Sequence, residues 1–188
     1  MTSVPSLATN VTSVADVYDV QLDSTNVLSR GTGATYSTGQ NSFRTQGFQN
    51  NGISTTNTDY FEFSLSPTNG KTLSLSSISA RFNGTTTFVT NNSNAGATNQ
   101  FAFSTNGTNW TLIASPVIVT GSSNTNWTMT VALTNVTALQ NLSSAQSASF
   151  RFFASGQTTT GGWGFFSSTN GVYGLEITGQ FSDAGSVS

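Results

Sequence analysis

The side chains that could perform chemistry in this chain are its carboxylates, because histidine and cysteine are both absent. Their absence removes the usual general base, the usual nucleophile–base pairs and most zinc sites. A glycosidase would need two carboxylates that face each other across a cleft. Glu62 and Glu176 instead lie in alternating, strand-like segments, where a glutamate faces solvent or pairs with a cross-strand arginine. Arg81 and Arg151 could be such partners, and the alternative is an arginine that lines a polar binding groove. We expect no enzymatic activity.

A second group of acidic residues lies near the N-terminus, at Asp16, Asp19 and Asp23. Hard cations bind carboxylate and carbonyl oxygens, so these three residues could hold a structural calcium ion. Their spacing matches no calcium loop, and the alternative is a solvated acidic strand edge that discourages pairing with other chains. Calcium is the only cofactor that the sequence leaves open.

Aromatic side chains could form a platform on which a sugar ring stacks. The candidates for carbohydrate binding are Trp163, Trp110, Trp127 and Tyr173, with Tyr36 and Tyr60 as further aromatic residues. Trp163 is the best placed, because it lies in Gly161-Gly162-Trp163-Gly164 and the flanking glycines would leave its ring open. The alternative is that these rings fill the core, since aromatic residues contribute the largest buried areas.

Composition excludes two classes of partner. The 188 residues carry a net charge of −2 with five basic residues, which gives no electrostatic footprint for nucleic acid. No segment approaches the roughly eighteen consecutive apolar residues of a membrane-spanning helix, so we expect no membrane insertion. Because only 6% of residues are charged, the surface must consist mainly of hydroxyls and amides. We expect an extracellular or cell-surface location, with copies of itself or surface polysaccharide as partners.

The elements that must position these residues are antiparallel strands. Phe101–Ile113 predicts a β-hairpin, since Asn106-Gly107 tolerates the positive φ angles of a tight turn. Asp59–Leu65 and Leu73–Phe82 alternate between apolar and polar residues, and a phase shift at Ser76-Ser77 suggests a β-bulge. Thr85–Val89 is expected to form another strand, and Thr134–Gln146 one short helical turn or a structured loop.

About ten short strands separated by turn signals predict an all-β fold. We expect an antiparallel two-sheet β-sandwich, jelly-roll-like, with an extended N-terminal arm. Residues 1–27 would form the arm or first strand, and residues 28–188 the sandwich domain. The predicted core positions are Phe61, Phe63, Leu73, Leu75, Phe101, Phe103, Phe150, Phe152 and Ile177.

The arm contains apolar residues that need a partner. The candidate subunit-contact residues are Val11, Val14, Val17, Val20 and Leu22. An extended segment satisfies its backbone groups by adding a strand to an open sheet edge, which can belong to another copy of the chain. It can equally fold back onto its own sandwich, and the sequence leaves both arrangements open.

Several segments carry a family resemblance. They are LSRGTG (28–33), NSFRTQGF (41–48), DYFEFSLSPTNGKTLSLSSISARF (59–82), FAFSTNGTNW (101–110), SFRFFASG (149–156) and GLEITGQF (174–181). In this order they resemble a β-sandwich accessory module of secreted and cell-surface bacterial proteins that carry C-terminal sorting signals. The resemblance implies a jelly-roll-like fold, an extracellular location and a role in carbohydrate binding or adhesion. It implies no catalytic residue, and it leaves residues 1–27 unmatched.

Two functions follow from these observations. The first is a non-catalytic extracellular structural or adhesive surface protein that could self-assemble through N-terminal strand addition. The alternative is a carbohydrate-binding module that uses exposed aromatic residues. The sequence favours the first, because the spacing of the tryptophans marks no platform.

Overall fold

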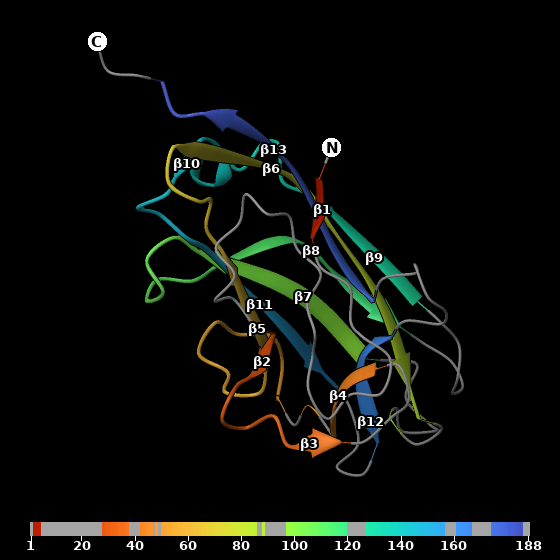
Figure 1. Ribbon diagram of the computed structural model, residues 1–188. Helices are drawn as coiled ribbons and strands as arrows, with labels where there is room; N and C mark the ends of the chain where they lie inside the picture. The colour runs from red at the N-terminus through yellow and green to blue at the C-terminus, as the bar shows by residue number, and fades with distance from the viewer. Residues whose placement is uncertain are drawn as a thin grey trace.

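The computed structural model describes residues 2–4, 28–37, 42–46, 48, 50–85, 88, 97–119, 127–156, 161–166 and 174–185 (Figure 1). Within these residues the chain forms thirteen strands and one short 3-10 helix. The strands are β1 (Thr2–Val4), β2 (Ser29–Arg30), β3 (Tyr36–Ser37), β4 (Ser42–Gln46), β5 (Phe61–Leu65), β6 (Lys71–Gly84), β7 (Ala97–Ser104), β8 (Thr111–Val119), β9 (Trp127–Ala132), β10 (Leu142–Ser143), β11 (Ala148–Ser155), β12 (Gly162–Phe166) and β13 (Leu175–Asp183). The helix η1 (Thr137–Leu139) is the short helical turn, one of the two forms expected for Thr134–Gln146.

The strands build two antiparallel sheets that pack face to face, which confirms the predicted two-sheet sandwich (Figure 1). The five-stranded sheet has the order β2-β5-β11-β7-β8. The eight-stranded sheet follows β1-β13-β6-β12-β4-β3, with β9 and β10 also paired to β6. The long β6 is the centre of this sheet, because it pairs with β13 along most of its length and with β12 at its end.

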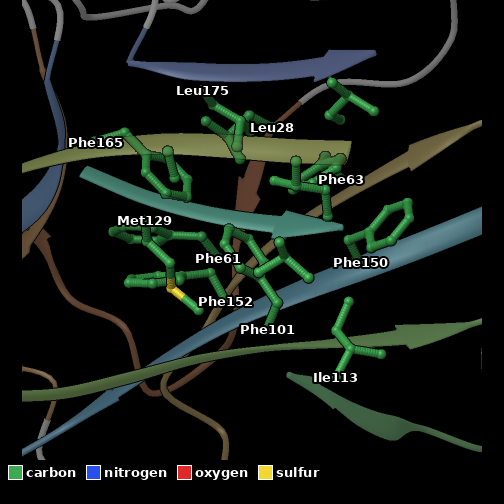
Figure 2. Packing of buried hydrophobic residues seen from close by; sticks show 14 of the residues in the cluster. Leu28, Phe61, Phe63, Phe101, Ile113, Met129, Phe150, Phe152, Phe165 and Leu175 are labelled. Carbon is green, nitrogen blue, oxygen red and sulfur yellow. The ribbon is translucent and has the colours of Figure 1, made fainter. Parts of the chain in front are cut away.

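Phenylalanine rings from the two inner faces fill the core. Phe82 of β6 stacks on Phe152 of β11 with ring centroids 4.8 Å apart, and Phe43 of β4 meets Phe61 of β5 edge-on at 4.9 Å. Figure 2 shows part of this cluster, with Phe61, Phe101 and Phe152 close together. All the predicted core positions are buried except Phe103, which is partly buried and packs against the cluster.

Two local predictions from turn chemistry are confirmed. In the β7–β8 hairpin, Gly107 has a φ of +71°, and Asn106 Oδ1 accepts hydrogen bonds from the backbone N–H groups of Thr108 and Asn109. The bulge in β6 lies at Ser76, because Thr178 of β13 pairs with Ser77 while Gly179 pairs with Leu75. These features fix which side chains of β6 and β7 face the core.

The strand expected over Thr85–Val89 is wrong for its described residues. Thr85 and Phe88 lie outside any strand, and the N–H of Phe88 donates to the carbonyl of Thr85 at 3.1 Å in a turn. The ring of Phe88 instead stacks on Trp163 with centroids 4.7 Å apart. The apolar character of this segment therefore reflects burial in the core and not strand pairing.

The start of the N-terminal arm belongs to its own sandwich. β1 pairs antiparallel with β13 of the same chain, with Thr2 opposite Gly179 and Val4 opposite Ile177. The predicted contact residues Val11, Val14, Val17, Val20 and Leu22 lie outside the described residues. In the described part of the chain, no helix has the length and apolar character needed to cross a membrane.

Candidate functional site

The structure corrects the prediction for Trp163. Its side chain is 0% exposed, and the indole stacks between Phe88 and Phe82, so the ring is not open to a sugar. The indole N–H donates to Asn99 Oδ1 at 3.0 Å, which links β12 of one sheet to β7 of the other. The neighbouring glycine permits close packing and not exposure, since a Cβ on Gly164 would lie 1.9 Å from the carbonyl oxygen of Phe43.

Of the other predicted binding and metal-site residues, the structure describes Trp127 and Trp110, which lie in different surroundings. Trp127 is partly buried and packs at the edge of the same cluster, 5.5 Å from both Phe88 and Trp163. Tyr173 and the calcium candidates Asp16, Asp19 and Asp23 lie outside the described residues. Among the residues that are described, no three His, Cys, Asp or Glu side chains gather where a metal ion could bind.

Trp110 has a different environment, on the outer face of the five-stranded sheet. The guanidinium carbon of Arg151, on β11, lies 3.9 Å from the ring centroid of Trp110 and 3.9 Å from that of Tyr60. The cation is therefore flanked by rings from either side of β11 in the sheet order, since Tyr60 precedes β5 and Trp110 precedes β8. Such contacts contribute roughly 0.5–2 kcal/mol each, depending on how far the cation is desolvated.

Cross-strand register brings an acidic group to the same place. Arg151 lies directly opposite Glu62 of β5, and its Nε donates to Glu62 Oε2 at 2.6 Å. The two side chains are 17% and 29% exposed, so the pair remains open to solvent. We call Tyr60, Glu62, Trp110 and Arg151 the Arg151 cluster. Its ion pair confirms the cross-strand pairing of Arg151 expected from the sequence.

The strand between Arg151 and Trp110 leaves room for this contact. Ala102 of β7 lies opposite Arg151 on one side and opposite Leu112 of β8 on the other. Alanine has the smallest side chain, and Ala102 is 0% exposed although it lies on the outer face. Because this side chain is small, the longer side chains of Arg151 and Trp110 can contact each other across β7. Beside the cluster, the hydroxyls of Ser64 and Ser149 lie 2.8 Å apart in a further cross-strand pair.

The cluster presents polar and apolar groups side by side. Within the described residues, Arg151 makes its hydrogen bond through Nε, which leaves the Nη hydrogens to donate to a ligand. Glu62 likewise uses Oε2, so Oε1 can accept. A flat cation, a carboxylate and two aromatic rings on one sheet face can bind a molecule with adjacent hydroxyls and an apolar C–H face.

Sequence reasoning found parts of this cluster but not the whole. Alternation placed Tyr60 and Glu62 on the polar face of their strand, and Arg151 among outward-pointing residues. It did not connect them with Trp110, because that contact depends on the order β5-β11-β7-β8 in space. The sequence did contain one indication of this contact. Trp110 and Leu112 are two residues apart, so both side chains lie on the outer face of the sheet.

Comparison of the chain with models of known families, with curated proteins and with solved structures finds no match. The resemblance to the bacterial surface module therefore stays a prediction.

Proposed function

We propose that this protein is a non-catalytic extracellular module that binds neutral carbohydrate through the Arg151 cluster. The observation that carries the proposal is the guanidinium of Arg151, held 3.9 Å from the rings of both Trp110 and Tyr60 and ion-paired with Glu62. A sugar offers hydroxyls that both donate and accept, and C–H faces that stack on aromatic rings. The Arg151 cluster offers the complement of each.

The charge of the cluster favours neutral over acidic sugars. Glu62 compensates the charge of Arg151 at 2.6 Å, so the site has no net positive charge to attract a carboxylate. The Nη donors and the Oε1 acceptor lie next to each other, which suits two neighbouring hydroxyls of one sugar ring. An acidic sugar would bring its charge close to Glu62 and be repelled.

The test is binding to a panel of soluble neutral polysaccharides (glucans, mannans, galactans and xylans), with pectate and alginate as acidic counterparts. Affinity electrophoresis should show retardation by at least one neutral polymer and none by the acidic ones. Trp110→Ala and Tyr60→Ala should each weaken binding about tenfold, equivalent to about 1.4 kcal/mol. Tyr36→Ala is the matched control. Tyr36 lies in β3 and is 47% exposed, and its ring centroid is 5.1 Å from the guanidinium carbon of a different arginine, Arg30.

Two results would contradict the proposal. One is failure of every polymer in the panel to bind. The other is binding that Trp110→Ala, Tyr60→Ala and Tyr36→Ala leave equally intact, which would put the site elsewhere.

The alternative function, a structural or adhesive protein that self-assembles by strand addition, has less support. β1 pairs with β13 of its own chain, so this part of the arm has a partner without a second copy. We retain self-assembly as the outcome to expect if glycan binding fails and the chain proves oligomeric.

A further inference from the structure

Asn-Gly pairs can undergo a reaction that needs no other side chain. The backbone nitrogen of the glycine attacks the side-chain amide carbon of the asparagine before it, and glycine has no Cβ to hinder the approach. The sequence contains five such pairs, which begin at Asn51, Asn69, Asn83, Asn106 and Asn170. The structure describes the first four, and Asn170 lies outside the described residues.

The fold restrains two of these pairs, those of Asn83 and Asn51. Asn83 lies within β6 and is 6% exposed, and its Oδ1 accepts a hydrogen bond from Arg44 at 3.1 Å. The nitrogen that would attack Asn51 belongs to Gly52, whose N–H donates to Ser155 Oγ at 2.8 Å. In both pairs one reacting group is held by a hydrogen bond, which must break before the reaction can begin.

Asn106 is exposed, but its side chain is fixed in the turn between β7 and β8. Its Oδ1 accepts three hydrogen bonds, from Ser104 Oγ at 3.0 Å and from the N–H groups of Thr108 and Asn109 at 2.9 and 2.8 Å. The amide carbon cannot approach the nitrogen of Gly107 while these bonds hold. Exposure alone therefore does not decide which pair reacts.

Asn69 has none of these restraints. It is exposed in the turn between β5 and β6, and its side chain makes no hydrogen bond to any residue that the structure describes. Gly70 has a φ of +79°, and nothing lies within 4 Å of its Cβ position. The N–H of Lys71 donates to the carbonyl of Thr68 at 3.1 Å, and the N–H of Ala184 to that of Gly70 at 2.9 Å. The peptide group between Asn69 and Gly70 takes part in neither bond, so it can rotate.

We propose that Asn69 is a site of spontaneous deamidation, with water as the only co-reactant. The nitrogen of Gly70 bonds to Asn69 Cγ, the Cγ–Nδ2 bond breaks, and the proton of the attacking nitrogen leaves with the amide as ammonia. This step closes a succinimide ring. Water then adds to one of the two ring carbonyls and breaks its bond to the ring nitrogen. Opening at Cγ gives aspartate, and opening at the backbone carbonyl gives isoaspartate.

Either product changes the turn in which it forms. A carboxylate appears two residues before Lys71, which is paired with Asp183 at 2.6 Å. The new carboxylate can compete for the Lys71 ammonium group. Isoaspartate also lengthens the main chain by one carbon atom, directly before β6 begins at Lys71. The reaction therefore alters both charge and backbone where β6 starts and β13 ends.

The test is incubation of the full folded chain in mildly alkaline buffer, followed by proteolysis and mass spectrometry. Fragment ions locate each conversion of an amide to an acid, and electron-transfer fragmentation separates isoaspartate from aspartate. We expect Asn69 to react about tenfold faster than Asn106, because Asn106 must first lose the hydrogen bonds to its Oδ1. Asn51 and Asn83 should also react more slowly than Asn69.

Three controls separate the effect of the fold from that of the sequence. In denaturant the four pairs should react at similar rates, since glycine follows the asparagine in each. Ser104→Ala removes one donor to Asn106 Oδ1, so it should raise the rate at Asn106 and leave the rate at Asn69 unchanged. Asn69→Gln should remove the fast product and leave the other three pairs unaffected.

The proposal is overturned if Asn51, Asn83 or Asn106 reacts as fast as Asn69 in the folded chain. It is also overturned if the relative rates of the four pairs are the same with and without denaturant, because the folded structure would then protect none of them.

Discussion

Arg151 and Arg44 illustrate how neighbouring groups decide what an outward-facing arginine does. Arg151 has a carboxylate at 2.6 Å and two aromatic rings at 3.9 Å. Arg44 has one amide oxygen at 3.1 Å, and within the described part of the chain its buried Nε has no acceptor. The first arrangement is electrically balanced and offers groups to a neutral ligand. The second has no carboxylate partner among the described residues.

At the same scale, Gly164 sets how closely β12 approaches β4. A Cβ at this position would lie 1.9 Å from the backbone carbonyl oxygen of Phe43, and a backbone atom cannot rotate away. We predict that Gly164→Ala lowers the free energy of unfolding by about 1–3 kcal/mol or more. Chemical denaturation measures the loss. Gly185→Ala is the control, because nothing lies within 4 Å of its Cβ position, and an equal loss in both variants would refute the steric explanation.

Asp183 provides a pH-dependent prediction. The hydrogen bond from Lys71 Nζ and the adjacent positive charge hold the pKa of Asp183 below its ordinary value of 3.8. A lowered pKa in the folded state means that the pair stabilises the fold above the ordinary value, and that this contribution is lost as the pH falls through the folded-state pKa. The carboxylate is 86% exposed, so solvent screening keeps the effect on stability small.

The measurement is an NMR titration of the Asp183 carboxyl. Lys71→Gln should raise its pKa toward the ordinary value, because both causes of the shift are removed. An unchanged pKa in this variant would show that Lys71 is not the source.

At the scale of elements, β12 and β7 are joined through the core by one polar contact. Trp163 of β12 donates its indole N–H to Asn99 of β7, and Asn99 Nδ2 donates to the carbonyls of Ala97 and Val117. The amide thus connects a strand of one sheet with two strands of the other. Its Oδ1 has no access to water that could replace the indole, since both residues are 0% exposed.

We therefore predict that Trp163→Phe destabilises the fold even though an aromatic ring is retained. Loss of the indole N–H leaves Asn99 Oδ1 without its donor, at a cost of about 1–3 kcal/mol in addition to the smaller ring volume. Trp127→Phe, at the partly buried edge of the same cluster, should cost less. Thermal unfolding of both variants provides the comparison, and a greater loss for Trp127→Phe would contradict the assigned role of Asn99.

The elements also show where sequence reasoning succeeds. Alternation in Asp59–Leu65 correctly separated Phe61 and Phe63 from Glu62, because period-two patterns report directly on the two faces of a strand. It could not reveal that Trp163 is buried, since flanking glycines permit either an open ring or close packing. The interruption of β8 was also missed. There Ala114 has a φ of +57° and a register shift falls opposite Gln100, and alanine carries no sequence signal for a positive φ.

At the scale of the whole molecule, β1 closes one edge of the eight-stranded sheet. β1 covers β13 over three residue pairs, from Thr2–Gly179 to Val4–Ile177. We predict that the full chain is monomeric at high concentration, and that deletion of residues 1–4 lowers the unfolding temperature by exposing the edge of β13. Light scattering after size exclusion measures the mass. An oligomer that dissociates on deletion would instead show that the strand is exchanged between copies.

Chemical-shift mapping tests most directly whether the outer face of the five-stranded sheet binds neutral carbohydrate. A short oligosaccharide from a polymer that binds is titrated into ¹⁵N-labelled protein. We predict that the largest saturable shifts occur at the indole N–H of Trp110, the Nε–H of Arg151 and the backbone amides around Tyr60 and Glu62, while β4 and β13 remain unperturbed. Shifts concentrated on the outer face of the eight-stranded sheet, with Trp110 and Arg151 unmoved, would contradict the assignment.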